Sequence, residues 1–332
     1  MLSKQEISDY DLNEILKRFD LGEIISVSPM LTSGNISYII KTNSRNYLLR
    51  LCPGAGERFR SVNEIFAEIE LLYYLKNKNF PVLIPLKDRN GKEIIYLKDY
   101  NGYIREFSGD YEKNNPTLEE IKKFGQTIGQ FHSLIENFNT KYKREHIFDL
   151  EATKEYFREN IDYILSSDFK NKEQFVSKVH SVLLSMNFPE TLPSGTIHED
   201  LGKRHVLWNK DDISAIIDFD RTYYGKLILD LGEACRVWCF TDNWTKWSNE
   251  NFKTLIKGYC EKRELTEYEK RFLVDAIKFE IIERSLSFCL RFIEETKDPE
   301  DEEYALYSVL ENGLLDMIDR NEIKIKNILK NI

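Results

Sequence analysis

The chain is poor in cysteine, proline and glycine, and it has no long apolar run. Its 332 residues include only 5 cysteines, 8 prolines and 15 glycines. The odd number and scattered spacing of the cysteines fit neither a disulfide framework nor a zinc site of the Cys-x-x-Cys kind. No stretch approaches the roughly 18 apolar residues of a membrane-spanning helix, and the polar start of the chain is unlike a signal peptide. We therefore expect a cytoplasmic protein with no membrane partner.

Basic residues are also too few for a general nucleic-acid binder, because the formal net charge is -9 and such proteins need a basic stripe to neutralise phosphates. The charge does not exclude a nucleotide, since one local cation and a metal ion offset a triphosphate. Hydrophobic residues make up 42% and charged residues 31%, as in folded proteins. The length allows one large domain or two lobes with substantial cores.

The first third of the chain, residues 23–107, alternates short apolar runs with polar turns. This pattern predicts strands at Ile36–Lys41, Tyr47–Cys52, Val82–Leu86, Glu93–Leu97 and Tyr103–Phe107. The first two are predicted to form a hairpin. Ser61 and Glu64 have capping-box spacing, and apolar residues then recur at helical intervals, so one helix is predicted after the hairpin.

The rest of the chain reads as mostly helical. Thr117 and Glu120 form a second predicted capping box before an apolar stripe. From residue 150 to the end helical patterns dominate, apart from residues 196–218. A small sheet-rich part followed by a larger helical part predicts an α+β fold, and the cleft between two such lobes is a usual place for a ligand.

Residues 196–220 carry the clearest chemical signal. His198 and Asp200 precede a loop, two short apolar strands follow as a predicted hairpin, and the hairpin ends in Asp218. If the hairpin closes, Asp218 returns beside the loop that holds Asp200 and His205. Taken singly, each of these residues is more often structural than catalytic. Together they supply the acidic cluster that phosphoryl transfer needs, with one carboxylate for the attacking hydroxyl and another for magnesium.

This segment resembles the catalytic region of the aminoglycoside phosphotransferase-like kinases, which include choline and homoserine kinases. Their pattern of His-Gly-Asp, a later asparagine, a hairpin and Ile-Asp-Phe is matched here at 198–200, at His205 and at 217–219. The resemblance implies a protein-kinase-like, two-lobed fold. Its small N-terminal antiparallel-sheet lobe would be the nucleotide-binding lobe, residues 1–107, and its larger helical lobe, residues 108–332, would carry catalysis and substrate binding.

The same resemblance implies roles for single residues. Asp200 would be the catalytic base, Asp218 would bind Mg²⁺ together with His205, and Asp230 would support the catalytic loop. Gly34 would lie in a turn that covers the phosphates of ATP or GTP. A cation at Arg50 would meet these phosphates and pair with Glu68 of the following helix. The hinge between the lobes, whose backbone groups would meet the adenine, would consist of Arg105, Glu106 and Phe107.

The chain departs from the family pattern at several positions. Glu199 replaces the usual glycine, and His205 replaces the usual magnesium-binding asparagine. Magnesium prefers oxygen ligands, so a water-mediated contact to His205 is expected rather than a direct one. Asp220 lies where glycine is common, and two interpretations are open for it, as a second metal ligand or as a salt-bridge partner of Arg221.

The resemblance implies a kinase that phosphorylates a hydroxyl of an amino alcohol, a sugar or a similar metabolite. An aminoglycoside antibiotic phosphotransferase and a non-catalytic binding protein on the same fold are the alternatives. A protein kinase is disfavoured because no long activation segment follows Asp218. The helical part is rich in acids and aromatics, which suit a cationic amine or merely form a solvated acidic surface. The residues concerned are Asp242, Glu250, Glu280, Glu283, Trp238, Trp244 and Trp247.

Overall fold

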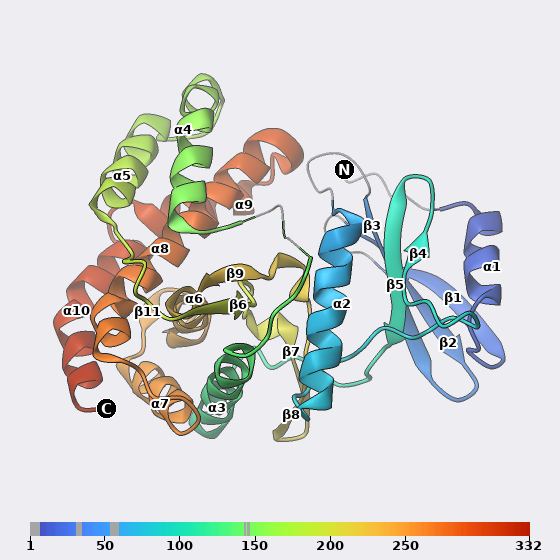
Figure 1. Ribbon diagram of the computed structural model, residues 1–332. Coiled ribbons are helices and arrows are strands. Elements are labelled where there is room, and N and C mark those ends of the chain that lie inside the picture. The colour runs from blue at the N-terminus through green and yellow to red at the C-terminus, as the bar shows by residue number, and fades with distance from the viewer. Residues whose placement is uncertain (1–6, 31–34, 54–59, 143, 145–146) are drawn as a thin grey trace.

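A computed structural model describes residues 7–30, 35–53, 60–142, 144 and 147–332. A sheet lies at one side of the molecule and a set of helices at the other, with α2 between them (Figure 1). The predicted α+β architecture of two unequal lobes is confirmed. No helix within the described residues is long and apolar enough to cross a membrane.

The N-terminal lobe is built on an antiparallel sheet with the strand order β1-β2-β3-β5-β4. Its strands are β1 (Ile24–Met30), β2 (Ile36–Thr42), β3 (Asn46–Pro53), β4 (Ile95–Tyr96) and β5 (Tyr100–Glu106). The predicted hairpin is therefore confirmed as β2 and β3. Its buried side chains belong to a core that also includes Ile15 and Leu16 of α1 (Asp9–Lys17).

One strand prediction was wrong, and one strand was not predicted. Residues Val82–Leu86 form only isolated bridges, from Val82 to Ile216 and from Pro85 to Arg105. Proline lacks the backbone N–H that a ladder needs, which accounts for the interruption. The edge strand β1 was not predicted. Its residues Ile25, Val27 and Pro29 alternate with serines, but nearly all of the strand is exposed and it contains a proline, which disfavours a strand.

Helix α2 (Val62–Asn77) begins at the predicted capping box, in which Ser61 and Glu64 exchange side-chain to backbone hydrogen bonds. One side of α2 packs on the sheet through Ile65 and Ile69. Leu71, Leu72 and Leu75 belong instead to the core of the helical part. The two lobes thus share a packed interface along α2, and the boundary between residues 107 and 108 stays a prediction.

The larger lobe holds eight long helices within the described residues. They are α3 (Leu118–Ile135), α4 (Leu150–Ser166), α5 (Lys172–Ser185), α6 (Leu227–Cys239), α7 (Asn249–Cys260), α8 (Glu267–Arg291), α9 (Pro299–Val309) and α10 (Leu314–Lys330). The predicted capping box at Thr117 and Glu120 is present at the start of α3. Glycine lets α3 and α7 approach closely, since a Cβ on Gly125 would lie 2.2 Å from the carbonyl oxygen of Leu255.

Three two-stranded antiparallel sheets lie among these helices. They pair β6 (Ser194–Ile197) with β9 (Tyr223–Lys226), β7 (Val206–Asn209) with β8 (Asp212–Ile216), and β10 (Phe240–Thr241) with β11 (Lys246–Trp247). The predicted hairpin before Asp218 is thus confirmed as β7 and β8. The backbone N–H of Ile216 donates to the carbonyl oxygen of Pro81 at 2.8 Å, which ties the hairpin to the segment that follows α2.

Candidate active site

The loop after β6 contains His198, Glu199 and Asp200 and is held by Asp230 of α6. The Asp230 carboxylate accepts hydrogen bonds from the backbone N–H groups of His198, at 2.8 Å, and Glu199, at 2.7 Å. Glu199 has φ 68°, a left-handed conformation that glycine adopts most readily. The contact at Asp230 is the support that the resemblance implied for this loop.

Histidine side chains brace the same loop from inside the core. His132 of α3 lies with Nε2 3.2 Å from Asp230 and Nδ1 2.8 Å from the hydroxyl of Tyr259. The Nδ1 atom of His198 accepts from the backbone N–H of Asp200 at 3.1 Å, and its Nε2 lies 3.1 Å from the carbonyl oxygen of Ile217. Burial lowers the pKa of His198, so the ring is neutral and its two hydrogen bonds link Asp200 to Ile217.

Asp200 is a nearly buried carboxylate that stays ionised. Arg284 of α8 lies 3.2 Å from Asp200 Oδ1, and Arg204 lies 3.3 Å from Oδ2. Burial by itself would raise the pKa of Asp200, but the guanidinium of Arg284 and the neighbouring cations hold that pKa below its ordinary value. The group can therefore accept a hydrogen bond from a hydroxyl at neutral pH.

The end of the β7–β8 hairpin brings Asp218 to this loop, as the sequence predicted. His205 Nδ1 donates to the carbonyl oxygen of Asp200 at 2.7 Å, and its Nε2 lies 3.2 Å from Asp218 Oδ2. Asp218, with φ 70°, also lies 2.9 Å from Arg50 of β3. Burial opposes ionisation, but Arg50 and His205 lower the pKa of Asp218 well below its ordinary value.

The atom of His205 that faces Asp218 is also near a donor, because Arg204 Nε lies 2.9 Å from His205 Nε2. Nε2 can accept from Arg204 when the ring is neutral, and it can donate to Asp218 only when the ring is protonated. Burial opposes protonation, but the carboxylates of Asp218 and Asp200 raise the pKa of His205 above its ordinary value.

Asp218 and Asp220 converge on a single cation, the guanidinium of Arg50. Two carboxylates around one positive charge form an oxygen-rich set that fits a hard cation such as magnesium. Of the two interpretations of Asp220, a salt bridge to Arg221 is wrong, because Asp220 pairs with Arg50 and Arg221 pairs with Glu283 and Glu199. The other, a metal ligand, stays a prediction.

The predicted pair of Arg50 and Glu68 is also wrong. Glu68 pairs with Arg60 at 2.8 Å and accepts from the hydroxyl of Tyr103 at 2.9 Å, whereas Arg50 turns to the two aspartates. The reason is local. Arg60 lies just before α2, the helix that carries Glu68, while Arg50 faces two carboxylates at once. Burial opposes ionisation of Glu68, but Arg60 lowers its pKa.

The predicted nucleotide residues of the hinge lie at the end of β5. The backbone N–H of Phe107 donates to the carbonyl oxygen of Asn46 at 2.9 Å, so the sheet already uses it. Arg105 donates to the carbonyl oxygen of Glu106 at 3.0 Å, and the Glu106 carboxylate pairs with Arg45. Binding of adenine here stays a prediction, and Gly34 lies outside the described residues.

The structure separates the acids and aromatics that were predicted to favour a cationic acceptor. Trp238 is core, stacked on Phe124 with ring centroids 3.7 Å apart, and Asp242 and Glu250 are exposed. Glu280 and Glu283 of α8 instead lie in the interior. There they meet Glu199, a contact that sequence reasoning missed. The signal in the sequence that could have revealed this contact is Glu199 itself, which stands where the family pattern has glycine.

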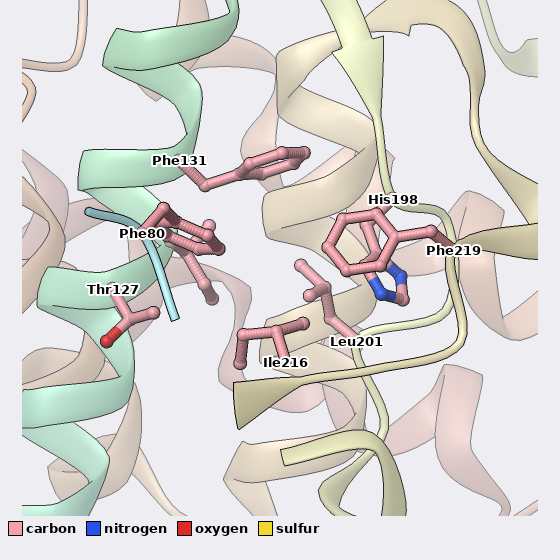
Figure 2. A pocket seen from close by; sticks show the side chains of 8 residues that line it. Phe80, Thr127, Phe131, His198, Leu201, Ile216 and Phe219 are labelled. Atoms are coloured by element: carbon pink, nitrogen blue, oxygen red, sulfur yellow. The ribbon is translucent and has the colours of Figure 1, made fainter. Parts of the chain in front are cut away.

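A small apolar cavity lies behind the catalytic loop. Figure 2 shows Phe80, Phe131 and Phe219 around it, with the ring of His198 at one side. Its volume is about 10 Å³, close to the space of one water molecule. The cavity is thus a gap in the core that supports His198 and is too small for a nucleotide or an acceptor.

The sequence of the chain is similar to a known family and to known relatives. A family model described as the phosphotransferase enzyme family matches residues 31–269. The homoserine kinase of Zymomonas mobilis is 28% identical over 274 residues, covering 80% of this chain and 81% of the relative. The homoserine kinase of Neisseria meningitidis serogroup B is 26% identical over 290 residues, covering 86% and 87%.

Solved structures with the same fold include other small-molecule kinases. An amicoumacin kinase solved in complex with AMP-PNP, Ca²⁺ and Ami superposes with a TM-score of 0.71 at 16% identity, covering 97% of this chain and 94% of that chain. A microcompartment-associated aminopropanol kinase has a TM-score of 0.69 at 16% identity, covering 96% and 99%. At this identity the likeness shows the fold.

Proposed function

The chain belongs to the phosphotransferase enzyme family, and from this premise we propose that it transfers the γ-phosphate of ATP to a hydroxyl of a small amino alcohol or related metabolite. That it is a phosphotransferase with a hydroxyl acceptor follows from the family and from its homoserine kinase relatives. The observation that carries the finer proposal is that His205 contacts both Asp200 and Asp218, so that the two aspartates lie side by side.

Asp200 has the position and charge of a catalytic base. Its carboxylate is ionised, partly accessible and held by Arg284. We assign to it the hydrogen bond from the acceptor hydroxyl, which aligns this oxygen for in-line attack on the γ-phosphorus. As the new P–O bond forms and the bond to the leaving diphosphate breaks, Asp200 takes the proton of the hydroxyl.

Asp218 and Asp220 would hold magnesium, with His205 behind Asp218. When bound, the ion would neutralise charge on the phosphates of the nucleotide. Arg50 lies between the two aspartates, and we assign its guanidinium to the phosphates once a metal ion takes the carboxylates. An arginine suits this role because its fork of donors matches phosphate oxygens. A direct bond from His205 to the metal is not needed here.

The choice of ATP is supported by the amicoumacin kinase of the same fold, which was solved with AMP-PNP and Ca²⁺. The nucleotide would lie between the lobes, at Gly34 and at Arg105, Glu106 and Phe107. Glu68 would act only through Arg60 and Tyr103, by fixing α2 against the sheet. The cytoplasmic location predicted from the sequence stays a prediction.

The class of acceptor is supported by the relatives. Homoserine kinases match over about four-fifths of the chain, and the aminopropanol kinase and a choline kinase from Cryptosporidium parvum share the fold. An aminoglycoside is the second candidate. It is favoured by His205, which some aminoglycoside kinases carry, and by the spectinomycin phosphotransferase of the same fold, with a TM-score of 0.61.

The test is release of ADP from ATP, with magnesium, against a panel of amino alcohols, hydroxy amino acids, sugars and aminoglycosides. We expect Asp200→Asn to lower kcat by about 10²–10⁴-fold, as loss of a general base does, while ATP still raises the melting temperature. Asp212→Asn, at the exposed start of β8 in the same hairpin, is the matched control and should keep full activity. Normal turnover by Asp200→Asn would refute the assignment.

A further inference from the structure

Three buried glutamates meet beside the catalytic loop and have no part in the mechanism above. Glu199 comes from the loop itself, and Glu280 and Glu283 come from α8. One carboxylate oxygen from each lies within 4.8 Å of the other two. All three side chains are almost wholly buried, a rare arrangement for carboxylates unless a cation accompanies them.

The cluster is incompletely satisfied. Glu280 is 0% exposed, and neither of its carboxylate oxygens has a hydrogen-bond partner in the described part of the chain. One carboxylate oxygen of Glu199 and one of Glu283 also lack a hydrogen-bond partner among the described residues. A buried polar atom without a partner is destabilising, so a cluster with several such atoms suits a ligand that supplies the donors.

Nearby arginines compensate only part of the negative charge. Arg221 lies 2.8 Å from Glu283 and 3.4 Å from Glu199. Arg284 lies 3.5 Å from Glu283, but it also faces Asp200 and Glu233. Two guanidinium groups are thus shared among four carboxyl groups, of which Glu233 also pairs with Arg236 and Asp200 with Arg204. No ion pair involves Glu280 within the described residues. Burial and then repulsion from Glu199 raise the pKa of Glu280, as expected where a cation is lacking.

The cluster is also close to the catalytic base. Glu199 is the residue before Asp200, and Arg284 contacts Asp200 on one side and Glu283 on the other. The guanidinium group of Arg284 therefore lies between Asp200 and the glutamate cluster.

We propose that Glu199, Glu280 and Glu283 form a subsite for the ammonium group of the acceptor, whose hydroxyl is bound by Asp200. The inference rests on the proposed function and names the group that selects the substrate. An ammonium group has three N–H donors, one for each carboxylate. The three carboxylate oxygens lie within 4.8 Å of one another, close enough for one ammonium group to reach all three with N–H···O bonds of about 2.8 Å.

A single positive charge suits this place better than a divalent metal ion. Arg221 and Arg284 already lie within 4 Å of the same carboxylates, so a divalent ion would be repelled by two neighbouring guanidinium groups. Calcium and magnesium also need six or more oxygen ligands. A metal site is the competing outcome that the experiment must separate.

The experiment compares acceptors that differ only in the amine. Homoserine and 4-hydroxybutyrate form one pair, and 3-aminopropanol and 1-propanol form another. In the wild type we expect kcat/KM to be at least about 10-fold higher with the amine, the factor that even one buried charged hydrogen bond provides. In Glu280→Gln we expect kcat/KM to fall about 10–100-fold for the amine acceptors and to stay within about twofold for the others.

Two further variants keep the test independent of folding defects. Glu199→Gly removes a carboxylate and places glycine at the left-handed position, so it should fold at least as well and lose the same preference. Glu269→Gln is the matched control, because Glu269 is also buried on α8 and pairs with Arg263. It lies about 16 Å along the helix from Glu280, so the preference for amines should stay intact.

Calorimetry with Asp200→Asn separates this proposal from the proposed function. Amine acceptors that bind to Asp200→Asn, and more weakly once Glu280→Gln is added, support the subsite even if no turnover is measured. The subsite is overturned if no amine binds, if amine and amine-free acceptors bind equally, or if Glu280→Gln leaves the difference unchanged. Binding of magnesium or calcium chloride alone that needs Glu280, without any effect of the amine, would make this a metal site instead.

Discussion

Replacement of Asp230 by alanine should uncouple the catalytic loop from the core. The Asp230 carboxylate, 0% exposed, accepts from the backbone N–H groups of His198 and Glu199 and lies 3.2 Å from His132 Nε2. In Asp230→Ala both backbone donors lose their partner inside the protein. The loop would then lose the contacts that hold Glu199 in its left-handed conformation and Asp200 in place.

The expected loss of stability follows from these contacts. Each buried donor left without a partner costs about 1–3 kcal/mol, so two of them lower the free energy of unfolding by about 2–6 kcal/mol. A native domain is stable by about 5–15 kcal/mol, so the variant should still fold. A shift of about 1 Å at Asp200 should lower kcat by roughly 10²-fold.

The assay pairs urea unfolding with kcat per folded molecule. Asp88→Ala is the control, because buried Asp88 accepts from the backbone N–H groups of Asn90, at 2.8 Å, and Lys92, at 2.9 Å, far along the chain from the site. It should lose similar stability and keep kcat. The reasoning fails if both variants lower kcat alike, or if Asp230→Ala unfolds at the same urea concentration as the wild type.

Two more predictions follow from the charges of the site. Arg50→Gln should raise KM for ATP by roughly 10-fold or more through loss of a charged contact, while calorimetry shows tighter magnesium binding without nucleotide, since Asp218 and Asp220 lose their competing cation. The pKa of Glu280 is raised above its ordinary 4.5 by burial and repulsion, so its contribution to stability is complete below pH 4.5 and is lost as pH rises through the raised pKa. Urea unfolding between pH 4 and 8 should therefore show a smaller loss in Glu280→Gln than in the wild type; equal slopes would contradict this.

Much of the fold and the catalytic loop was predictable because the signals are local. The capping boxes at Ser61 and Thr117 involve residues three apart, and the hairpin before Asp218 has a short polar turn between apolar strands. The spacing of His198, Asp200 and Asp218 could be recognised in the sequence because only one loop and one hairpin separate these residues. Strand β1 was missed because it is a largely exposed edge strand that contains a proline, which disfavours a strand in the sequence.

Sequence alone thus determined the two capped helices and the hairpin that brings Asp218 back toward Asp200, since these depend on residues within about 20 positions of one another. Only the tertiary structure decided the charge pairs. Several carboxylates could have paired with Arg50. In the packed lobes Arg50 pairs with Asp218 and Asp220, and Glu68 pairs with Arg60. Glu199 and Glu280 are 81 positions apart in the sequence, and they meet because α8 crosses beneath the catalytic loop, where Arg284 contacts both the loop and the acids.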